Sequence, residues 1–105
     1  MKNSNKEHIL FNYSNHSISR AAQRGIQTPS IETIIQEGKT IHKQGYKFLF
    51  MTVKELRYHA PAEQKKLKNL VVVMAGDSNT VVTCYKNKDA IGNIKRKSKR
   101  LLKNN

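Results

Sequence analysis

The chain has little of several residue types, and each shortage removes a class of structure or chemistry. Its 105 residues include one cysteine and no tryptophan, so we expect no internal disulfide and no multi-cysteine zinc site. Only seven residues are acidic, and their spacing shows no paired carboxylates of the kind that hold divalent metals in nucleases. The longest apolar run, LVVVMA at 70–75, is far shorter than the roughly 20 residues that cross a bilayer. The sequence therefore predicts a domain without metal or cofactor that does not insert into a membrane.

Positive charge, in contrast, is in large excess. Twenty Lys and Arg residues against seven acidic ones give a formal net charge of +13, which predicts a polyanion or an acidic protein as partner. A chain of this length fits a single domain, 1–105. We expect its core at about 14–86 and a basic C-terminal arm at 87–105, either extended or as a short amphipathic helix.

Capping residues and the period of the apolar positions predict the order of the elements. Ser14 or Asn15 can cap a helix at 15–24 that ends at Gly25, and Pro29 in the first turn favours a second helix at 29–37. The residues before Ser14 are expected to be loosely packed or to add one short strand.

The rest of the chain, apart from the arm, is expected to form strands and one loop. Runs of branched and aromatic residues predict strands in the segments 40–43, 46–53, 70–75 and 80–86. The last two strands form a hairpin around the turn GDSN, and 54–69 is expected to be an exposed loop with a short helical turn at 62–67. The fold class is thus α+β, with two N-terminal helices packed on one face of a roughly four-stranded antiparallel sheet.

The stretch HSISRAAQRGI at 16–26 carries the most distinctive pattern. His16, Arg20 and Arg24 are four residues apart and therefore lie on one side of the first helix. The apolar residues expected on its opposite side are Ile18, Ala21 and Ala22. The simplest interpretation is the solvated side of an amphipathic helix. The alternative is chemistry, because histidine can transfer protons near neutral pH and guanidinium groups bind phosphate oxygens in pairs.

Other polar residues extend this hypothesis. Thr83 and Tyr85 would share a face of the last strand with Val81 and could contact a phosphate, although β-propensity alone also explains them. His42 and His59 are candidates for a second acid or base, or are solvated surface. The residues expected to contact nucleic acid phosphates are Lys43, Lys47, Lys95, Arg96, Lys97, Lys99 and Arg100.

Between 14 and 86 the sequence resembles a family of small bacterial domains of unknown function. The residues that carry the resemblance are the string His-x3-Arg-x3-Arg-Gly-Ile near the start and Thr-x-Tyr near the end. That family is similar to the barnase, colicin and RelE-like ribonuclease toxins. The resemblance implies an active cleft formed by His16, Arg20, Arg24, Thr83 and Tyr85. It also implies action in the cytoplasm, either by a free-standing protein or by the end of a larger, delivered toxin.

These observations predict a metal-independent endoribonuclease of the toxin type that cleaves RNA, tRNA included, through a 2′,3′-cyclic phosphate. As a toxin it would need an acidic immunity or antitoxin protein to protect the producing cell. Two alternatives stay open. One is a nucleic-acid-binding module without catalysis, in which His16 is incidental. The other is a RelE-like toxin or regulator that acts by binding a protein.

Overall fold

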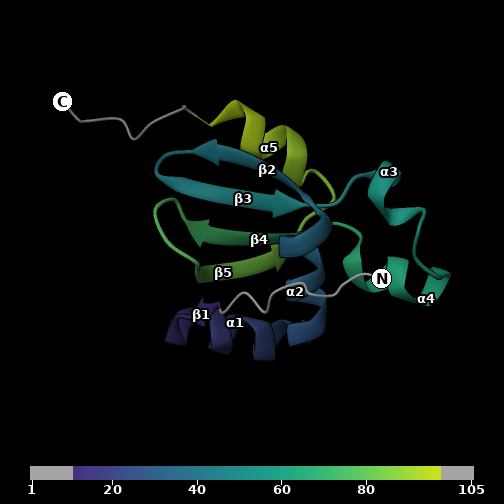
Figure 1. Ribbon diagram of the computed structural model, residues 1–105, viewed down its shortest axis with the longest axis horizontal. Helices are drawn as coiled ribbons and strands as arrows, with labels where there is room; N and C mark the ends of the chain where they lie inside the picture. The colour runs from purple at the N-terminus through teal and green to yellow at the C-terminus, as the bar shows by residue number, and fades with distance from the viewer. Residues whose placement is uncertain (1–10, 98–105) are drawn as a thin grey trace, which may run out of the picture.

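The computed structural model describes residues 11–97, which form a mixed sheet covered by helices (Figure 1). The α+β class is therefore confirmed, with more elements than the sequence predicted. In chain order the described elements are β1 (Asn12–Tyr13), α1 (Asn15–Arg24), α2 (Thr28–Glu37), β2 (Lys39–Lys43), β3 (Tyr46–Phe50), α3 (Val53–Leu56), α4 (Pro61–Leu67), β4 (Leu70–Ala75), β5 (Thr80–Lys86) and α5 (Ala90–Arg96).

The sheet has five strands in the order β1-β5-β4-β3-β2. The four predicted strands form its antiparallel part, and the β4–β5 hairpin lies where the sequence predicts it. The fifth strand, β1, runs parallel to β5 and pairs only with Thr80 and Val81. Most of the outer edge of β5 thus lies beyond the short β1, and it is there that α1 packs.

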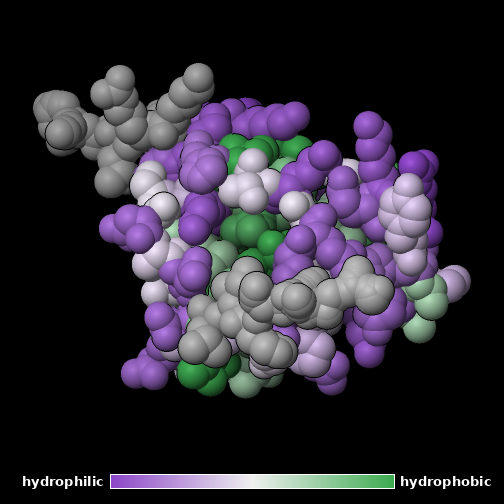
Figure 2. Space-filling view, viewed as in Figure 1, coloured by the Kyte–Doolittle hydropathy of each residue, from purple (hydrophilic) through white to green (hydrophobic). Residues whose placement is uncertain are grey.

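Helices cover both faces of the sheet, whereas the sequence predicted helices on one face only. On one face, Ile31 and Ile34 of α2 and Leu67 of α4 pack in the same cluster as Val72 and Met74. On the other face α5 covers the aromatic residues of β3, and this second cluster consists of Phe48, Phe50, Val71, Val73, Ala90 and Ile94. In the view of Figure 2 the exterior is mostly hydrophilic, with apolar side chains visible between the polar ones near the middle.

Of the two forms allowed for the basic arm, its first part takes the short amphipathic helix, and this helix packs on the core beyond the expected limit at residue 86. The α5 helix carries Lys95 and Arg96 in its last turn, but its Ile94 is fully buried and Ala90 is nearly so. The basic residues dominate the composition here, while two apolar positions four apart determine the packing. Lys99 and Arg100 lie outside the described residues.

The segment 54–69 is also more ordered than the predicted loop. A capping box at Thr52 and Glu55 begins α3, and Pro61 stands in the first turn of α4. Each helix buries one leucine, Leu56 and Leu67 respectively, in the core beneath α2. The helical turn predicted at 62–67 corresponds to α4, whereas α3, with one buried leucine, has too little periodicity to be recognised in the sequence.

The first helix occupies the predicted residues but turns a different side to the sheet. The Ser14 side chain accepts a hydrogen bond from the Ser17 N–H and donates one to the Val82 carbonyl, both at 3.0 Å. Ser17 is buried and Ala21 packs on the core, whereas Ile18 is 56% exposed. The expected apolar side is thus only partly right, because small residues allow the helix to lie close against β5.

Candidate active site

Five residues predicted from the sequence line one open cavity. His16, Arg20 and Arg24 come from α1, and Thr83 and Tyr85 come from β5, about sixty residues further along the chain. The cavity has a volume of about 680 Å³, and Lys86 and Asn87 complete its lining. The structure therefore brings together the two motifs whose association the sequence could only suggest.

The packing of α1 explains why its polar stripe faces this cavity. Ser17 and Ala21 lie on the side of α1 that faces the sheet. His16 and Arg20 each precede one of them in the sequence and therefore lie about 100° away around the helix, on the adjacent side. Arg24 continues the same row one turn later. The helix then ends at Gly25, whose φ of 65° is in the left-handed region and whose N–H returns to the carbonyls of Ala21 and Ala22.

A register shift in β5 selects the strand residues that reach the cavity. Val73 pairs with Thr83, but the next residue, Met74, pairs with Val81, so that Val82 is an extra residue in a bulge. The predicted face is correct for Thr83 and Tyr85 and wrong for Val81, which is buried with Cys84 in the cluster on the α2 side. A bulge reverses the alternation on one side of it, and no feature of the sequence marks this one.

The two arginines are held to different degrees. An Nη1 of Arg24 donates to the Cys84 carbonyl at 3.0 Å, which ties the end of α1 to the edge of β5. Among the described residues, Arg20 makes a side-chain hydrogen bond only within its own helix, from Nη1 to the Gln23 side-chain oxygen at 3.3 Å. Since a guanidinium has five N–H donors, both side chains retain donors that can bind an anion in the cavity.

The cavity is cationic, and its phenol is protonated near neutral pH. Burial raises the pKa of Tyr85 above 10.0, so this residue is a neutral hydrogen-bond donor. Burial also raises the pKa of the neighbouring Cys84 thiol, and the charge of Arg24 only partly opposes this. Among the described residues that line the cavity there is no carboxylate. Such a set of groups suits an anion with several oxygen acceptors, a phosphate above all.

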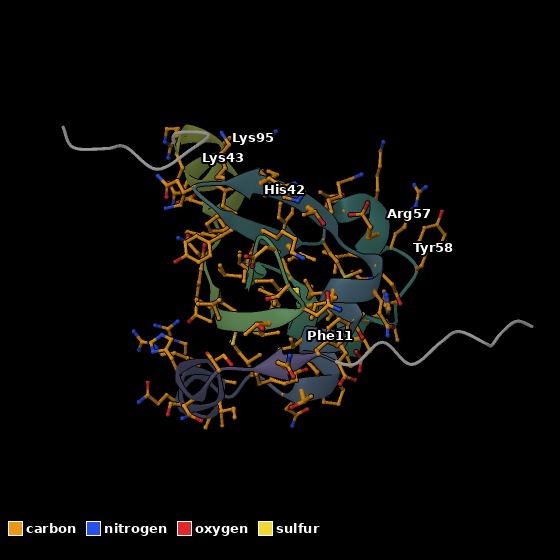
Figure 3. All side chains as sticks on the ribbon, turned by 60° about the vertical axis from the view of Figure 1, so that its left-hand side comes forward. Phe11, His42, Lys43, Arg57, Tyr58 and Lys95 are labelled. Carbon is orange, nitrogen blue, oxygen red and sulfur yellow. The ribbon has the colours of Figure 1, made fainter. Side chains whose placement is uncertain are left out.

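The other predicted phosphate contacts lie elsewhere. Lys43 on β2 donates to the carbonyls of Lys95 and Lys97 at 3.1 and 3.0 Å, and Figure 3 shows Lys43 beside Lys95 at the α5 end. Lys47 donates to the Ser78 carbonyl at 3.1 Å. Three strand spacings, roughly 14 Å, separate β2 from β5. Lys43, Lys95 and Arg96 therefore form a second basic region on the α5 face, whereas Lys47, which pairs with Met74, lies on the opposite face of the sheet.

Neither of the other candidate histidines lines the cavity. His42 is on β2 (Figure 3), and His59 lies between α3 and α4, where its Nε2 is 2.7 Å from a Glu37 carboxylate oxygen. Lys86 and Asn87 are the lining residues that the sequence interpretation missed. The sequence signal for them was their position directly after the Thr-x-Tyr pair, because consecutive residues at the end of a strand lie close together in space.

Two further properties of residues 11–97 concern membranes and metal ions. No helix in this part of the chain combines the length and apolar character needed to cross a membrane. The same residues contain no group of three or more His, Cys, Asp or Glu side chains placed to hold a metal ion.

Comparisons of the whole chain with protein-family models, with curated proteins and with solved structures find no match.

Proposed function

We propose that the protein is a metal-independent endoribonuclease whose active site is the cavity between α1 and β5. The observation that carries the proposal is the convergence of His16, Arg20, Arg24, Thr83 and Tyr85 on one cavity. They supply a proton-transfer group, two guanidinium groups and two hydroxyls, while the lining described above contains no acid. These groups suit the cleavage of a phosphodiester, in which the attacking hydroxyl loses a proton and negative charge builds on the phosphate oxygens.

In the proposed reaction the ribose 2′-OH attacks the adjacent phosphorus. His16 accepts the proton of the 2′-OH as the O2′–P bond forms, and the P–O5′ bond breaks to leave a 2′,3′-cyclic phosphate. The departing 5′-oxygen takes up a proton from the solvent that reaches the open cavity. Arg20 and Arg24 stabilise the charge that builds on the non-bridging oxygens, while Thr83 and Tyr85 donate hydrogen bonds that orient the phosphate.

The test is cleavage of bacterial RNA in the presence of EDTA, with the cut ends mapped. We expect discrete cuts that end in a cyclic phosphate, and no cuts in a substrate with 2′-deoxy residues at the cleaved positions. His16→Gln should lower the initial rate about 100- to 10,000-fold, whereas the matched change His42→Gln, outside the cavity, should leave the rate unchanged. RNA that stays intact with the wild-type protein, or equal rates for the two variants, would contradict the proposal.

A ribonuclease that acts in the cytoplasm also requires protection of the producing cell. We therefore propose an acidic immunity or antitoxin protein that covers the cavity or the basic region around Lys43. With a net charge of +13 on this chain, association should be fast at low salt and slow down as salt rises. Unimpaired growth of cells that express the domain alone would count against both the toxin and the need for such a partner.

A further inference from the structure

A second, smaller cavity adjoins the candidate active site. Its volume is about 120 Å³, and Lys86 lines both cavities. The residues around it come from the turn between α1 and α2, from α2, from α4 and from the end of β5, and they are Gly25, Ile26, Gln27, Ser30, Lys66 and Lys86. The two cavities therefore adjoin one another at Lys86.

The lining of the smaller cavity favours an anion. Lys66 and Lys86 line it from different elements, and the Lys86 ammonium donates a hydrogen bond to the Lys65 carbonyl at 3.3 Å. The N-terminus of α2 lies at the same place, because Gln27 is the residue that precedes the helix. Gln27 provides no side-chain cap and the first turn has no acidic residue, so the positive end of the helix dipole is not neutralised locally.

Ser30 adds a hydroxyl group to the lining of the smaller cavity. The residue is 7% exposed, yet it lines the cavity. Within the described part of the chain its hydroxyl makes no hydrogen bond, unlike Thr33 in the same helix, which donates to the Pro29 carbonyl. Its oxygen is not among the enclosed, unpartnered polar atoms of the described residues, so it is accessible and can donate a hydrogen bond to an oxyanion in the cavity.

We propose that this smaller cavity binds the phosphate next to the scissile phosphate of the RNA. The inference rests on the proposed function, since it makes the two cavities neighbouring subsites on one polynucleotide. The side chains that hold this second phosphate are Lys66, Lys86 and Ser30. The enzyme should consequently prefer substrates that carry a phosphate on both sides of a nucleotide, as an internal position in a chain does.

Binding of uncleavable dinucleotides tests the subsite without any cleavage. The probes are a 2′-deoxy dinucleoside monophosphate and the same molecule with one additional phosphate at its 5′ or 3′ end. We expect one of the extended probes to bind at least threefold more tightly in low salt. We also expect the slope of log K against log salt to steepen by about 0.7, the value for one neutralised phosphate on a single strand.

Lys66→Gln should abolish that gain, because Lys66 lines only the smaller cavity. Lys68→Gln is the matched control, since it removes the same charge from an exposed residue that lines neither cavity. No gain with either extended probe, or a gain that survives Lys66→Gln, would overturn the subsite. Cleavage of the corresponding ribonucleotide is measured in a separate assay. If the protein binds the extended probe more tightly but does not cut RNA, the phosphate subsite is supported and the proposed function is refuted.

Discussion

Replacing Ile94 by alanine tests whether α5 is part of the core or a dispensable basic arm. Ile94 is completely buried beneath the helix, in a cluster with Phe48, Phe50 and Val73. The change removes three carbon atoms and leaves a cavity that the β3 and β4 side chains, themselves buried, can fill only in part. Substitutions of this kind lower the free energy of unfolding by about 2–5 kcal/mol, and the loss is near the lower value when neighbouring side chains refill the cavity.

That cost is large compared with the stability of a domain of this size, which is typically about 5–15 kcal/mol. Each kcal/mol lowers the melting temperature by about 4–8 °C, so Ile94→Ala should melt at least about 8 °C below the wild type. Lys95→Ala is the control, because Lys95 is exposed in the same helix turn and its loss should change stability by no more than about 0.5 kcal/mol.

Urea denaturation of both variants, followed by circular dichroism, measures the difference. We expect a lower midpoint for Ile94→Ala at an unchanged slope, since the native state still buries the same elements. If the two variants unfold at the same urea concentration, α5 contributes no packing and the reasoning from its buried residues is refuted. A chain truncated after residue 86 should then also be stable, whereas we expect it to unfold.

Three further predictions address the site and the framework around it. Arg20→Lys should lower the cleavage rate at least tenfold, about 1.4 kcal/mol. The melting temperature should stay unchanged, because the side-chain hydrogen bond that Arg20 makes among the described residues is to exposed Gln23 in its own helix. An unaltered rate would mean that Arg20 belongs only to the solvated side of the helix. Gly38→Ala should destabilise the domain by about 1–3 kcal/mol in urea unfolding, because a Cβ would lie 2.5 Å from the Phe50 carbonyl oxygen; wild-type stability would contradict this contact. Hydrogen bonds from Thr52 lower the pKa of Glu55 below 4.5, so its contribution is complete above that pH and is lost as the pH falls through the lowered value; the stability difference between wild type and Glu55→Gln, measured from pH 7 to pH 3, should therefore shrink, and a constant difference would argue against the effect.

Local signals in the sequence predict the elements that have clear capping or turn residues and a regular spacing of apolar residues. The prediction of α1 is correct at both ends, because Ser14 caps the helix and Gly25 takes the left-handed conformation. The prediction of the β4–β5 hairpin is correct, because two runs of β-branched residues flank a turn of Gly, Asp, Ser and Asn. These features depend on neighbours in the chain and therefore need no knowledge of the tertiary structure.

The features that the sequence did not predict depend on distant contacts. Whether 90–96 is an arm or a packed helix is decided by the aromatic face of β3 on which Ile94 rests. The bulge at Val82 depends on how β5 pairs with β4, and it decides which side chains of β5 face the cavity. The spacing of His16, Arg20 and Arg24 predicted their common side, but only the close approach of α1 to β5 places them opposite Thr83 and Tyr85.

The local framework around the cavity explains how the chain tolerates several cationic groups in one place. Arg20, Arg24 and Lys86 share the cavity with His16, and groups of like charge repel one another. Contacts that do not depend on a ligand resist this repulsion: the Ser14 cap, the close packing of Ser17, and the bond from Arg24 to the Cys84 carbonyl. The cavity is therefore held open and positively charged before any anion arrives. An anion that binds only the folded chain then relieves the repulsion and stabilises the fold, by about 2.7 kcal/mol at a hundred times its dissociation constant. The repulsion between these groups in the free protein would thus contribute to the phosphate affinity that we propose.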